Sequence, residues 1–242
     1  MDRALFAAAT GMAAQQRNLD TIADNLSNSD VAGFKGSVQT FAELAAPGEG
    51  GLGTTPLGSH LLLTQGKLAK SGGSFDLAIE GPGFFNVVGA RGERAYTRGG
   101  AFERRADGSV RDARGYALRG VSIPADALSA TVSEDGTIRA TFTGGTRTLG
   151  RISLAEFAAP DRLRSIGGSA FEATPQSGRA REIVPGPKDG PKIRFGMLEQ
   201  SNVSIVEAMM QILTAQRAYE ANAKGVQAAD EMLRIANNLQ RG

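Results

Sequence analysis

The chain has 242 residues, 41% of them hydrophobic, which is enough to bury one or two cores and argues against wholesale disorder. Its 27 Lys and Arg residues nearly balance its 25 Asp and Glu residues, so the net charge of +2 gives only a weak reason to expect nucleic acid. The absence of cysteine and the single histidine exclude disulfides, thiolate zinc sites, cysteine nucleophiles and multi-histidine metal sites. We therefore expect no cofactor, and the 32 glycines favour turn-rich β-structure.

The N-terminal segment predicts an amphipathic helix from about residue 3 to residue 28. Apolar residues recur every seven positions, and a second series lies three positions after each of them, as in a heptad repeat. The a positions are Leu5, Met12, Leu19 and Leu26, and the d positions are Ala8, Gln15 and Ile22. The Ala-rich start could pass for the core of a signal peptide, but the helical pattern continues well beyond it. We therefore interpret it as a helix.

Polar residues end this helix, and a connector rich in glycine follows. The side chains of residues 25–30 compete for backbone hydrogen bonds, and Gly33 allows a turn with positive φ. Residues 42–58 are rich in Gly and Pro and contain almost no large apolar residue, which predicts a loop or an extended connector. A short strand is expected at residues 61–64.

From residue 75 to about residue 195, short apolar stretches alternate with turn residues, which predicts an all-β domain. Hairpin turns are expected at Asp107-Gly108, Asp135-Gly136 and Gly144-Gly145. Residues 175–191 are again rich in Gly and Pro and are interpreted as the return path to the C-terminal segment. The expected strands are residues 77–79, 84–88, 95–97, 101–105, 110–112, 116–119, 131–133, 137–142 and 149–157.

Residues 201–239 predict a second, longer heptad helix. Ser204 and Glu207 have the spacing of a capping box, so we expect the helix to begin near Val203. At 1.5 Å per residue it would be roughly 50 Å long, which is typical of a helix that packs against other helices. The a positions are Ile205, Ile212, Tyr219, Val226 and Leu233, and the d positions are Ala208, Ala215, Asn222, Ala229 and Ala236.

The expected fold is α+β, with the N- and C-terminal helices pairing as a coiled coil. Residues 1–35 and 200–242 would form this discontinuous helical domain, residues 36–74 an extended connector, and residues 75–199 a central β domain with a return linker. Gln15 and Asn222 are polar residues on the two seams that either fix register or face solvent. Because an alanine-rich seam buries little apolar area, we expect both ends to become ordered only when several copies pack together.

Three separated motifs resemble a known family, the bacterial flagellar rod and hook proteins. Residues 24–28 followed by Gly33-Phe34-Lys35 are similar to the signature near the start of these proteins. Further similarities are the central motif at residues 76–85, its continuation at residues 96–102, and the C-terminal signature at residues 201–203 and 216–222. Residues 121–125, 165–167 and 219–220 are most similar to the distal rod branch, whereas the first three residues are more like a proximal rod protein.

The resemblance implies a structural subunit of the basal-body rod that polymerises into a hollow helical shaft and transmits motor torque to the hook. The implied partners are copies of itself, other rod and hook subunits, the surrounding ring proteins and the flagellar export apparatus, with no nucleic acid or small-molecule substrate. The implied location is the periplasm-spanning rod, reached without a cleaved signal peptide. The expected assembly interface consists of Leu5, Met12, Leu19, Ile22, Leu26, Ile205, Ile212, Tyr219, Val226 and Leu233.

Other chemistries find little support in the sequence. Gly81-Pro82-Gly83 begins like a dinucleotide fingerprint but has Asn86 in place of the third glycine, and Gly66-Lys67 lacks the flanking residues of a phosphate loop. Paired carboxylates such as Asp107 and Asp112 could act as acid and base, but we expect both in turn-like or exposed surroundings that leave a pKa near its usual value. The alternative from another class is a polyanion-binding protein that uses outward-facing arginines at positions 91, 94, 98, 104, 105, 111, 114 and 119.

Overall fold

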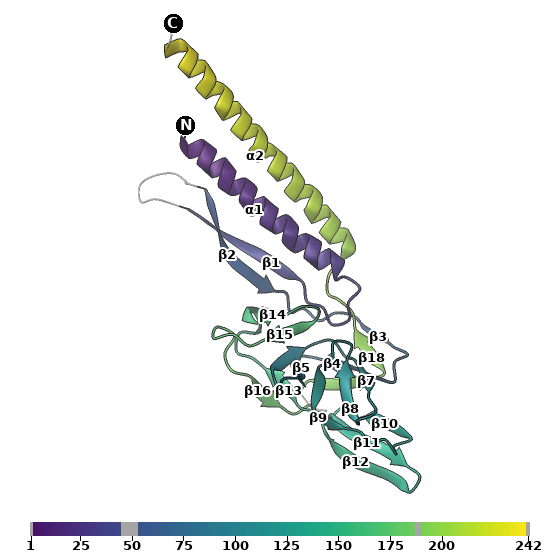
Figure 1. The fold of residues 1–242 in the computed structure, drawn as a ribbon. Coiled ribbons are helices and arrows are strands. Elements are labelled where there is room, and N and C mark those ends of the chain that lie inside the picture. Colours follow the sequence, from purple (N-terminus) through teal and green to yellow (C-terminus); the bar gives the residue numbers. More distant parts are fainter. Residues whose placement is uncertain (1, 45–52, 187–189, 241–242) are drawn as a thin grey trace. The chain divides into compact units, whose positions relative to one another are not determined.

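The computed structural model describes residues 2–44, 53–186 and 190–240, and the chain divides into two compact units (Figure 1). The helical unit comprises residues 1–27, 37–60 and 203–242, and the β unit comprises residues 28–36 and 61–202. Residues 36–74, expected to form a connector, are therefore shared between the two units.

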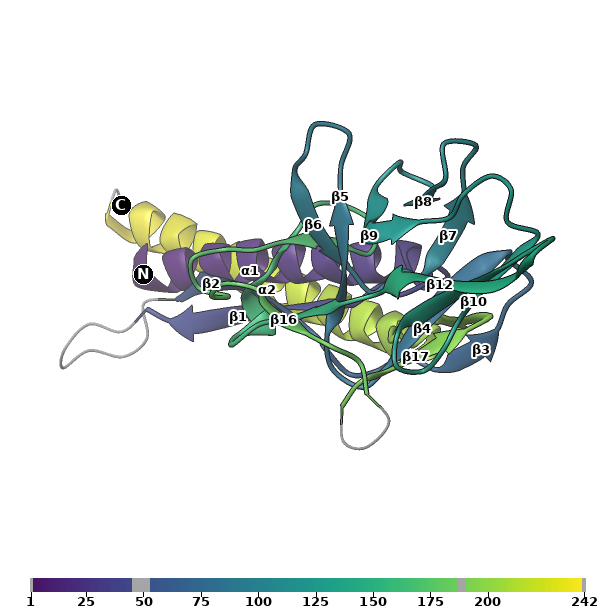
Figure 2. The ribbon, with the colours of Figure 1, turned by 90° about the horizontal axis from the view of Figure 1, so that it is seen from below.

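The helical unit is built around two helices, α1 (Asp2–Ser27) and α2 (Ile205–Gln240). They lie side by side and antiparallel, as Figures 1 and 2 show from two directions. The backbone N–H of Glu207 donates to the Ser204 hydroxyl at 3.4 Å, so Ser204 caps α2 as its spacing indicated. The prediction of an α+β chain whose terminal helices are in contact and flank a β domain is confirmed. No helix among the described residues is long and apolar enough to cross a membrane.

Strands β1 (Ser37–Glu43) and β2 (Thr54–Leu61) form a two-stranded sheet in the helical unit. The strand expected at residues 61–64 is wrong, because β2 already ends at Leu61. More than half of β2, residues 54–58, lies in the stretch predicted to be a loop. Backbone pairing and a contact with α1 explain the difference, since Leu44 N donates to Gly53 O at 2.7 Å and Thr54 N donates to Thr10 Oγ1 at 3.2 Å. The middle of the expected loop, residues 45–52, lies outside the described residues.

The β unit is organised around an antiparallel sheet in the order β14-β15-β6-β5-β9-β8-β7-β4-β17, with β13 paired to β5 and to β16. These strands are β4 (Phe75–Glu80), β5 (Phe84–Val88), β6 (Arg94–Thr97), β7 (Ala101–Arg104), β8 (Ser109–Asp112), β9 (Ala117–Ser122), β13 (Leu154–Glu156), β14 (Arg164–Ser165), β15 (Ala170–Glu172), β16 (Arg181–Ile183) and β17 (Lys192–Phe195). A three-stranded sheet contains β10 (Ser129–Val132), β11 (Thr137–Phe142) and β12 (Gly145–Arg151). A two-stranded sheet joins β3 (Leu68–Lys70) to β18 (Met197–Glu199), and a short 3₁₀ helix, η1, spans Pro160–Arg162.

The core of the β unit is formed by the buried faces of these strands. Phe85, Phe102, Leu77 and Ile138 are among its fully buried side chains, and Phe85 packs edge-on against Phe102 with ring centroids 5.5 Å apart. Most predicted strands are present within one or two residues, and β5 and β11 have the predicted bounds. The single strand expected at residues 149–157 is wrong, because the chain breaks into β12 and β13 where Ile152 N donates to Gly136 O at 2.9 Å.

Two predicted hairpin turns share one local structure. Gly108 and Gly136 have φ of 80° and 79°, which favours glycine, and the preceding Asp107 and Asp135 carboxylates each accept a backbone N–H two residues later. The Ser109 and Thr137 hydroxyls also donate to these carboxylates and hold their pKa values below the usual range of an aspartate. Both aspartates therefore act in turns, and the expectation that Asp107 keeps its usual pKa is wrong because the Ser109 bonds lower it. Asp112 is not exposed either, since it is buried and paired with Arg114.

Candidate assembly interface

The seam between α1 and α2 is formed by small residues. Ala208, Ala215 and Ala229, three of the d positions of α2, are buried, as are Ala14 and Ile22 of α1. Alanine allows two helix backbones to approach closely.

Asn222, the polar d residue of α2, faces Gly11 of α1. A methyl group placed on Gly11 would lie 3.0 Å from Asn222 Nδ2. Because Gly11 has no side chain, α1 leaves room for the Asn222 amide. Of the two interpretations, this favours Asn222 fixing the register between α1 and α2 over Asn222 facing solvent.

The ten predicted interface residues all belong to the helical unit, but they differ in burial. In α1, Ile22 is buried, and Leu5, Met12, Leu19 and Leu26 are half-buried. In α2, Ile212 and Val226 are half-buried, and Ile205 and Tyr219 are 44% and 39% exposed. The side chain of Leu233 lies outside what the structure describes. The alanine positions of α2, rather than its larger a residues, therefore form the centre of the seam within one copy.

A second apolar face of α2 points away from α1 and was missed by the sequence analysis. Val206, Met209, Met210 and Leu213 are 54–71% exposed. Their spacing of i, i+3, i+4 and i+7 places them on one side of the helix, roughly opposite Ala208 and Ala215. A search for apolar residues at i, i+3, i+4 and i+7 from every residue of the helix, and not only along the heptad series, would have found these four residues. A helix with apolar surface on two sides is typical of one that packs against more than one neighbour.

Beside the start of α2 lies a groove of about 570 Å³ within the helical unit. Ile22 and Asn25 of α1, Val38 of β1, and Met210 and Ala215 of α2 are among its lining residues. Met210 and Val38 are exposed, so the apolar face of α2 continues into this groove. The exposed apolar surface at this end of α2 is therefore larger than the four residues named above.

The signature at the end of α1 has a clear structural role. Asn25 is buried, and its side chain donates to Ser37 O at 2.7 Å and accepts from Ser37 N at 2.8 Å. Both hydrogen-bonding groups of one β1 residue are thus satisfied by a single amide, which fixes where β1 begins relative to α1.

A cluster of three buried charges joins the other signatures within the β unit. Glu199 lies at the end of β18, and its Oε1 accepts from Lys35 Nζ at 2.6 Å. Arg98 faces the same carboxylate, with Nε 3.0 Å from Oε2 and Nη2 3.4 Å from Oε1. All three side chains are almost completely buried. The first motif and the continuation of the central motif, which are remote in the sequence, therefore meet at Glu199, two residues before the C-terminal motif.

The excess positive charge of this cluster is balanced by backbone carbonyls. Lys35 Nζ also donates to Thr64 O at 2.8 Å, and Arg98 Nη1 donates to Gly81 O and Gly83 O at 2.9 and 2.7 Å. Burial lowers the pKa of the Lys35 ammonium, and the hydrogen bond with Glu199 opposes that shift. Burial likewise lowers the pKa of Arg98. This pattern of partners is that of a structural anchor.

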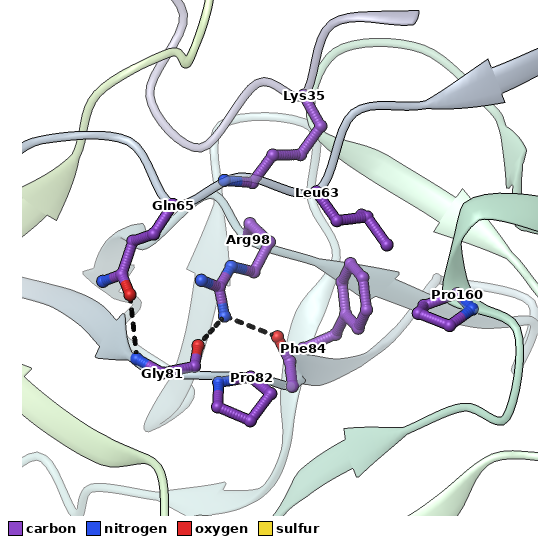
Figure 3. Close-up of a pocket in the computed structure, with 9 residues that line it drawn as sticks. Lys35, Leu63, Gln65, Gly81, Pro82, Phe84, Arg98 and Pro160 are labelled. Carbon is purple, nitrogen blue, oxygen red and sulfur yellow. Dashed lines mark hydrogen bonds between the residues drawn. The ribbon is translucent and has the colours of Figure 1, made fainter.

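Figure 3 shows the pocket beside this anchor, of about 340 Å³. Gln65 accepts from Gly81 N at 3.0 Å, Arg98 reaches the Gly81–Gly83 carbonyls, and Phe84 and Pro160 form the apolar side. The polar groups of the wall bond to one another. Gly81 and Gly83, which resembled the start of a dinucleotide fingerprint, thus present their carbonyl oxygens to Arg98.

Gly33 allows the first motif, which contains Lys35, to pass close to the backbone of Arg98. Its φ is +69°, and a Cβ at this position would lie 2.3 Å from the backbone carbon of Arg98. We expect Gly33→Ala to lower the free energy of unfolding of the β unit by about 2 kcal/mol or more, since it adds both backbone strain and a clash. Chemical denaturation measures the change. Gly72→Ala is the matched control, because nothing lies within 4 Å of its added methyl group, and equal losses in both variants would contradict this role.

Asn202 ties together several places where the chain leaves the β unit. Its Oδ1 accepts from Gly36 N at 2.9 Å, its Nδ2 donates to Leu62 O at 2.7 Å, and its backbone N–H donates to Phe34 O at 3.4 Å. Residues 36, 62 and 202 lie next to boundaries between the two units. One side chain therefore holds three chain segments together.

The arginines proposed as a polyanion site do not form one exposed surface. Arg98 was expected to face outward, and this is wrong, because its guanidinium is buried against Glu199. Most of the others are already engaged: Arg104 donates to Ala127 O, and Arg105, Arg111 and Arg114 form ion pairs with Glu103, Asp107 and Asp112. The structure thus offers no support for a polyanion-binding function.

Comparison with known proteins adds independent information. Residues 5–35 match the family described as "Flagella basal body rod protein", residues 78–140 the "Flagellar hook protein FlgE/F/G D1 domain", and residues 195–239 the "Flagellar basal body rod FlgEFG protein C-terminal". These matches contain the residues of the anchor: Lys35 in the first, Arg98 in the second and Glu199 in the third.

Full-length relatives agree with these matches. The flagellar basal-body rod protein FlgG of Borreliella burgdorferi is 38% identical to this chain, and the alignment covers 100% of both proteins. FlgG of Agrobacterium fabrum is 35% identical over 97% of this chain and 98% of the relative. The rod protein FlgF of Caulobacter vibrioides is 32% identical over 98% of this chain and 97% of the relative. The prediction of a non-enzymatic protein similar to the distal rod branch is confirmed, and the chain belongs to the flagellar basal-body rod protein FlgG family of distal rod subunits.

Proposed function

We propose that this rod subunit acts by polymerising with copies of itself into a hollow helical shaft, through the helices at its two ends. Residues 1–35 and 200–242 would form the wall of the shaft, and the β domain at residues 75–199 would carry lateral contacts. The shaft would transmit motor torque to the hook. Assembly with other flagellar rod subunits follows from family membership, whereas the hook subunits, the surrounding ring proteins and the export apparatus are proposed partners.

The observation that carries this proposal is the second apolar face of α2. Within one copy α1 covers the alanine side of the helix, and Val206, Met209, Met210 and Leu213 remain more than half exposed on the other side. Four exposed large apolar residues at helical spacing would be costly in water for a lone molecule. A contact between different surfaces of successive copies, repeated with a rotation that does not close, would cover them and generate a helical polymer.

Export is the second part of the proposal. We propose that the chain passes through the flagellar export apparatus unfolded and without a cleaved signal peptide. The absence of cysteine supports this route, because no disulfide has to be avoided or reduced before threading. The alanine-rich seam supports it too, because a helix pair that buries little apolar area unfolds at low cost. Pulldown of the newly made chain with the export apparatus, followed by mass determination of the exported protein, tests both points.

The polymerisation proposal is tested with purified protein over a range of concentrations. Sedimentation and electron microscopy should show tubes above a critical concentration, and the helical circular dichroism per residue should rise as the tubes form, because packing stabilises the terminal helices. A monomer that stays compact and fully helical at every concentration and never forms tubes would contradict the proposal.

A further inference from the structure

The exposed face of α1 carries a charge pattern that has no ion-pair partner within the described residues. Phe6, Ala9, Ala13, Arg17 and Asp20 are all exposed and lie on the side of α1 away from the buried Ala14 and Ile22. Arg17 forms no ion pair there, and the Asp20 carboxylate accepts only the amide of Gln16, at 3.0 Å. The outward face of α1 is therefore apolar near its start and charged further along.

The outward face of α2 repeats the same charge pattern. Arg217 and Glu220 have the spacing of Arg17 and Asp20, a cation followed three residues later by an anion. Both are exposed, lie on the side of α2 away from the alanine seam, and form no ion pair with any described residue. Lys224 and Ala228 follow on the same face.

Two patterns with the same spacing form two opposite-charge pairs at once only when the helices run antiparallel. In a parallel pair Arg17 would meet Arg217, whereas in an antiparallel pair Arg17 meets Glu220 and Asp20 meets Arg217. Within one copy α1 and α2 are antiparallel. In a polymer whose copies all point the same way, α1 of one copy and α2 of the next are therefore antiparallel as well. The charges thus suit an open row of like-oriented copies.

We propose that the outward face of α1 in one copy packs against the outward face of α2 in the next, with Arg17 paired to Glu220 and Asp20 paired to Arg217. This inference rests on the proposed polymerisation and specifies one of its contacts. The partner that covers the outward face of α2 is a second copy of this chain, because its α1 carries the complementary charges at the matching spacing. Such pairs chiefly fix register and neighbour choice, since like charges brought together are strongly disfavoured.

The register that aligns the charges also brings small residues of the two faces together. It places Ala9 beside Ala228, where small side chains permit close approach, and it places Phe6 opposite Glu231, within one helical turn of Met232 and Ile235. Phe6, Met232 and Ile235 are each more than half exposed in the single copy. The register differs by four residues, about 6 Å along the axis, from the one within a copy, where Gly11 faces Asn222.

Charge reversal tests the register. We expect Arg17→Glu and Glu220→Arg each to raise the critical concentration for polymerisation about tenfold or more, because each brings like charges together at every contact. The double variant should return it to within about threefold of the unchanged protein. Asp230→Arg is the matched control, since it reverses an exposed charge of α2 away from this face. Failure of the double variant to restore assembly, or an equal effect of Asp230→Arg, would overturn the register.

Cysteine crosslinking identifies the neighbour directly, because the chain has no cysteine of its own. Polymers formed from a mixture of R17C and E220C chains, oxidised and analysed by mass spectrometry, should yield a disulfide between position 17 of one chain and position 220 of another. Dimers joined through two copies of position 17 or two of position 220 would show a symmetric contact instead. If tubes form normally but contain no crosslink between positions 17 and 220, this inference fails while the proposed polymerisation stands. If no condition yields tubes, both fail.

Discussion

Glu199→Ala is expected to destabilise the β unit by about 3–5 kcal/mol, because it leaves two buried cations without their carboxylate. Lys35 Nζ and the Arg98 guanidinium both lie against Glu199, and all three side chains are almost completely buried. Removing one member of a buried ion pair costs far more than removing an exposed one, since the remaining charges cannot regain water. For a domain of this size the loss corresponds to a fall in Tm of roughly 10 °C.

The measurement is thermal or urea unfolding followed by the near-ultraviolet signal of tyrosine. Tyr96 and Tyr116 belong to the β unit and are buried or half-buried, whereas the third tyrosine, Tyr219, is exposed in the helical unit and contributes little to that signal. Glu80→Ala is the matched control, since Glu80 pairs with Arg194 on the surface. Exposed pairs contribute about 0–1 kcal/mol, so the control should unfold close to the unchanged protein. Equal midpoints for the two variants would show that the buried cluster contributes no more than a surface ion pair.

Ile212→Asp is expected to abolish polymerisation and, in a motile bacterium, motility. Ile212 is half-buried in the helical unit, between the buried Ala208 and Ala215 of the seam. A carboxylate at that position would need water that close packing of helices excludes. Because residue 212 belongs to the helical unit alone, the unfolding transition of the β unit should persist with an unchanged midpoint.

Sedimentation of the purified variant measures assembly, and the tyrosine signal reports the β unit in the same sample. Gln216→Asp is the control, because it adds the same charge at an exposed position one turn further along α2. Loss of the β-unit transition in Ile212→Asp would contradict the separation of the two units. Normal tube formation by this variant would remove the helix seam from the assembly interface.

The terminal helices were predictable because their apolar period extends over many turns. The heptad repeat found both helices and their contact, but it could not tell whether the alanine or the larger series lies closer to the partner helix. Close approach favours the alanines, which leaves Ile205 and Tyr219 exposed. Strands such as β5 and β11 were found because apolar residues and glycine turns bound them, whereas β16, with the sequence Arg-Glu-Ile, carries no such pattern.

The buried anchor could not have been predicted from residue types. A charged residue is expected at the surface unless it is paired, and Lys35 and Arg98 lie 164 and 101 positions from Glu199. Only the fold brings such distant positions together. The one available signal was that each charge stands in or next to a signature motif, and the resemblance alone did not say what the charges do.

The bonds of Asn202 have a mechanical consequence. Three chain segments at the edge of the β unit, at residues 36, 62 and 202, are joined by one side chain. A force that pulls on any one of them is therefore divided among all three, so no single hydrogen bond carries the full load. If the rod transmits torque as proposed, such sharing would hold together the segments by which the chain enters and leaves the β unit.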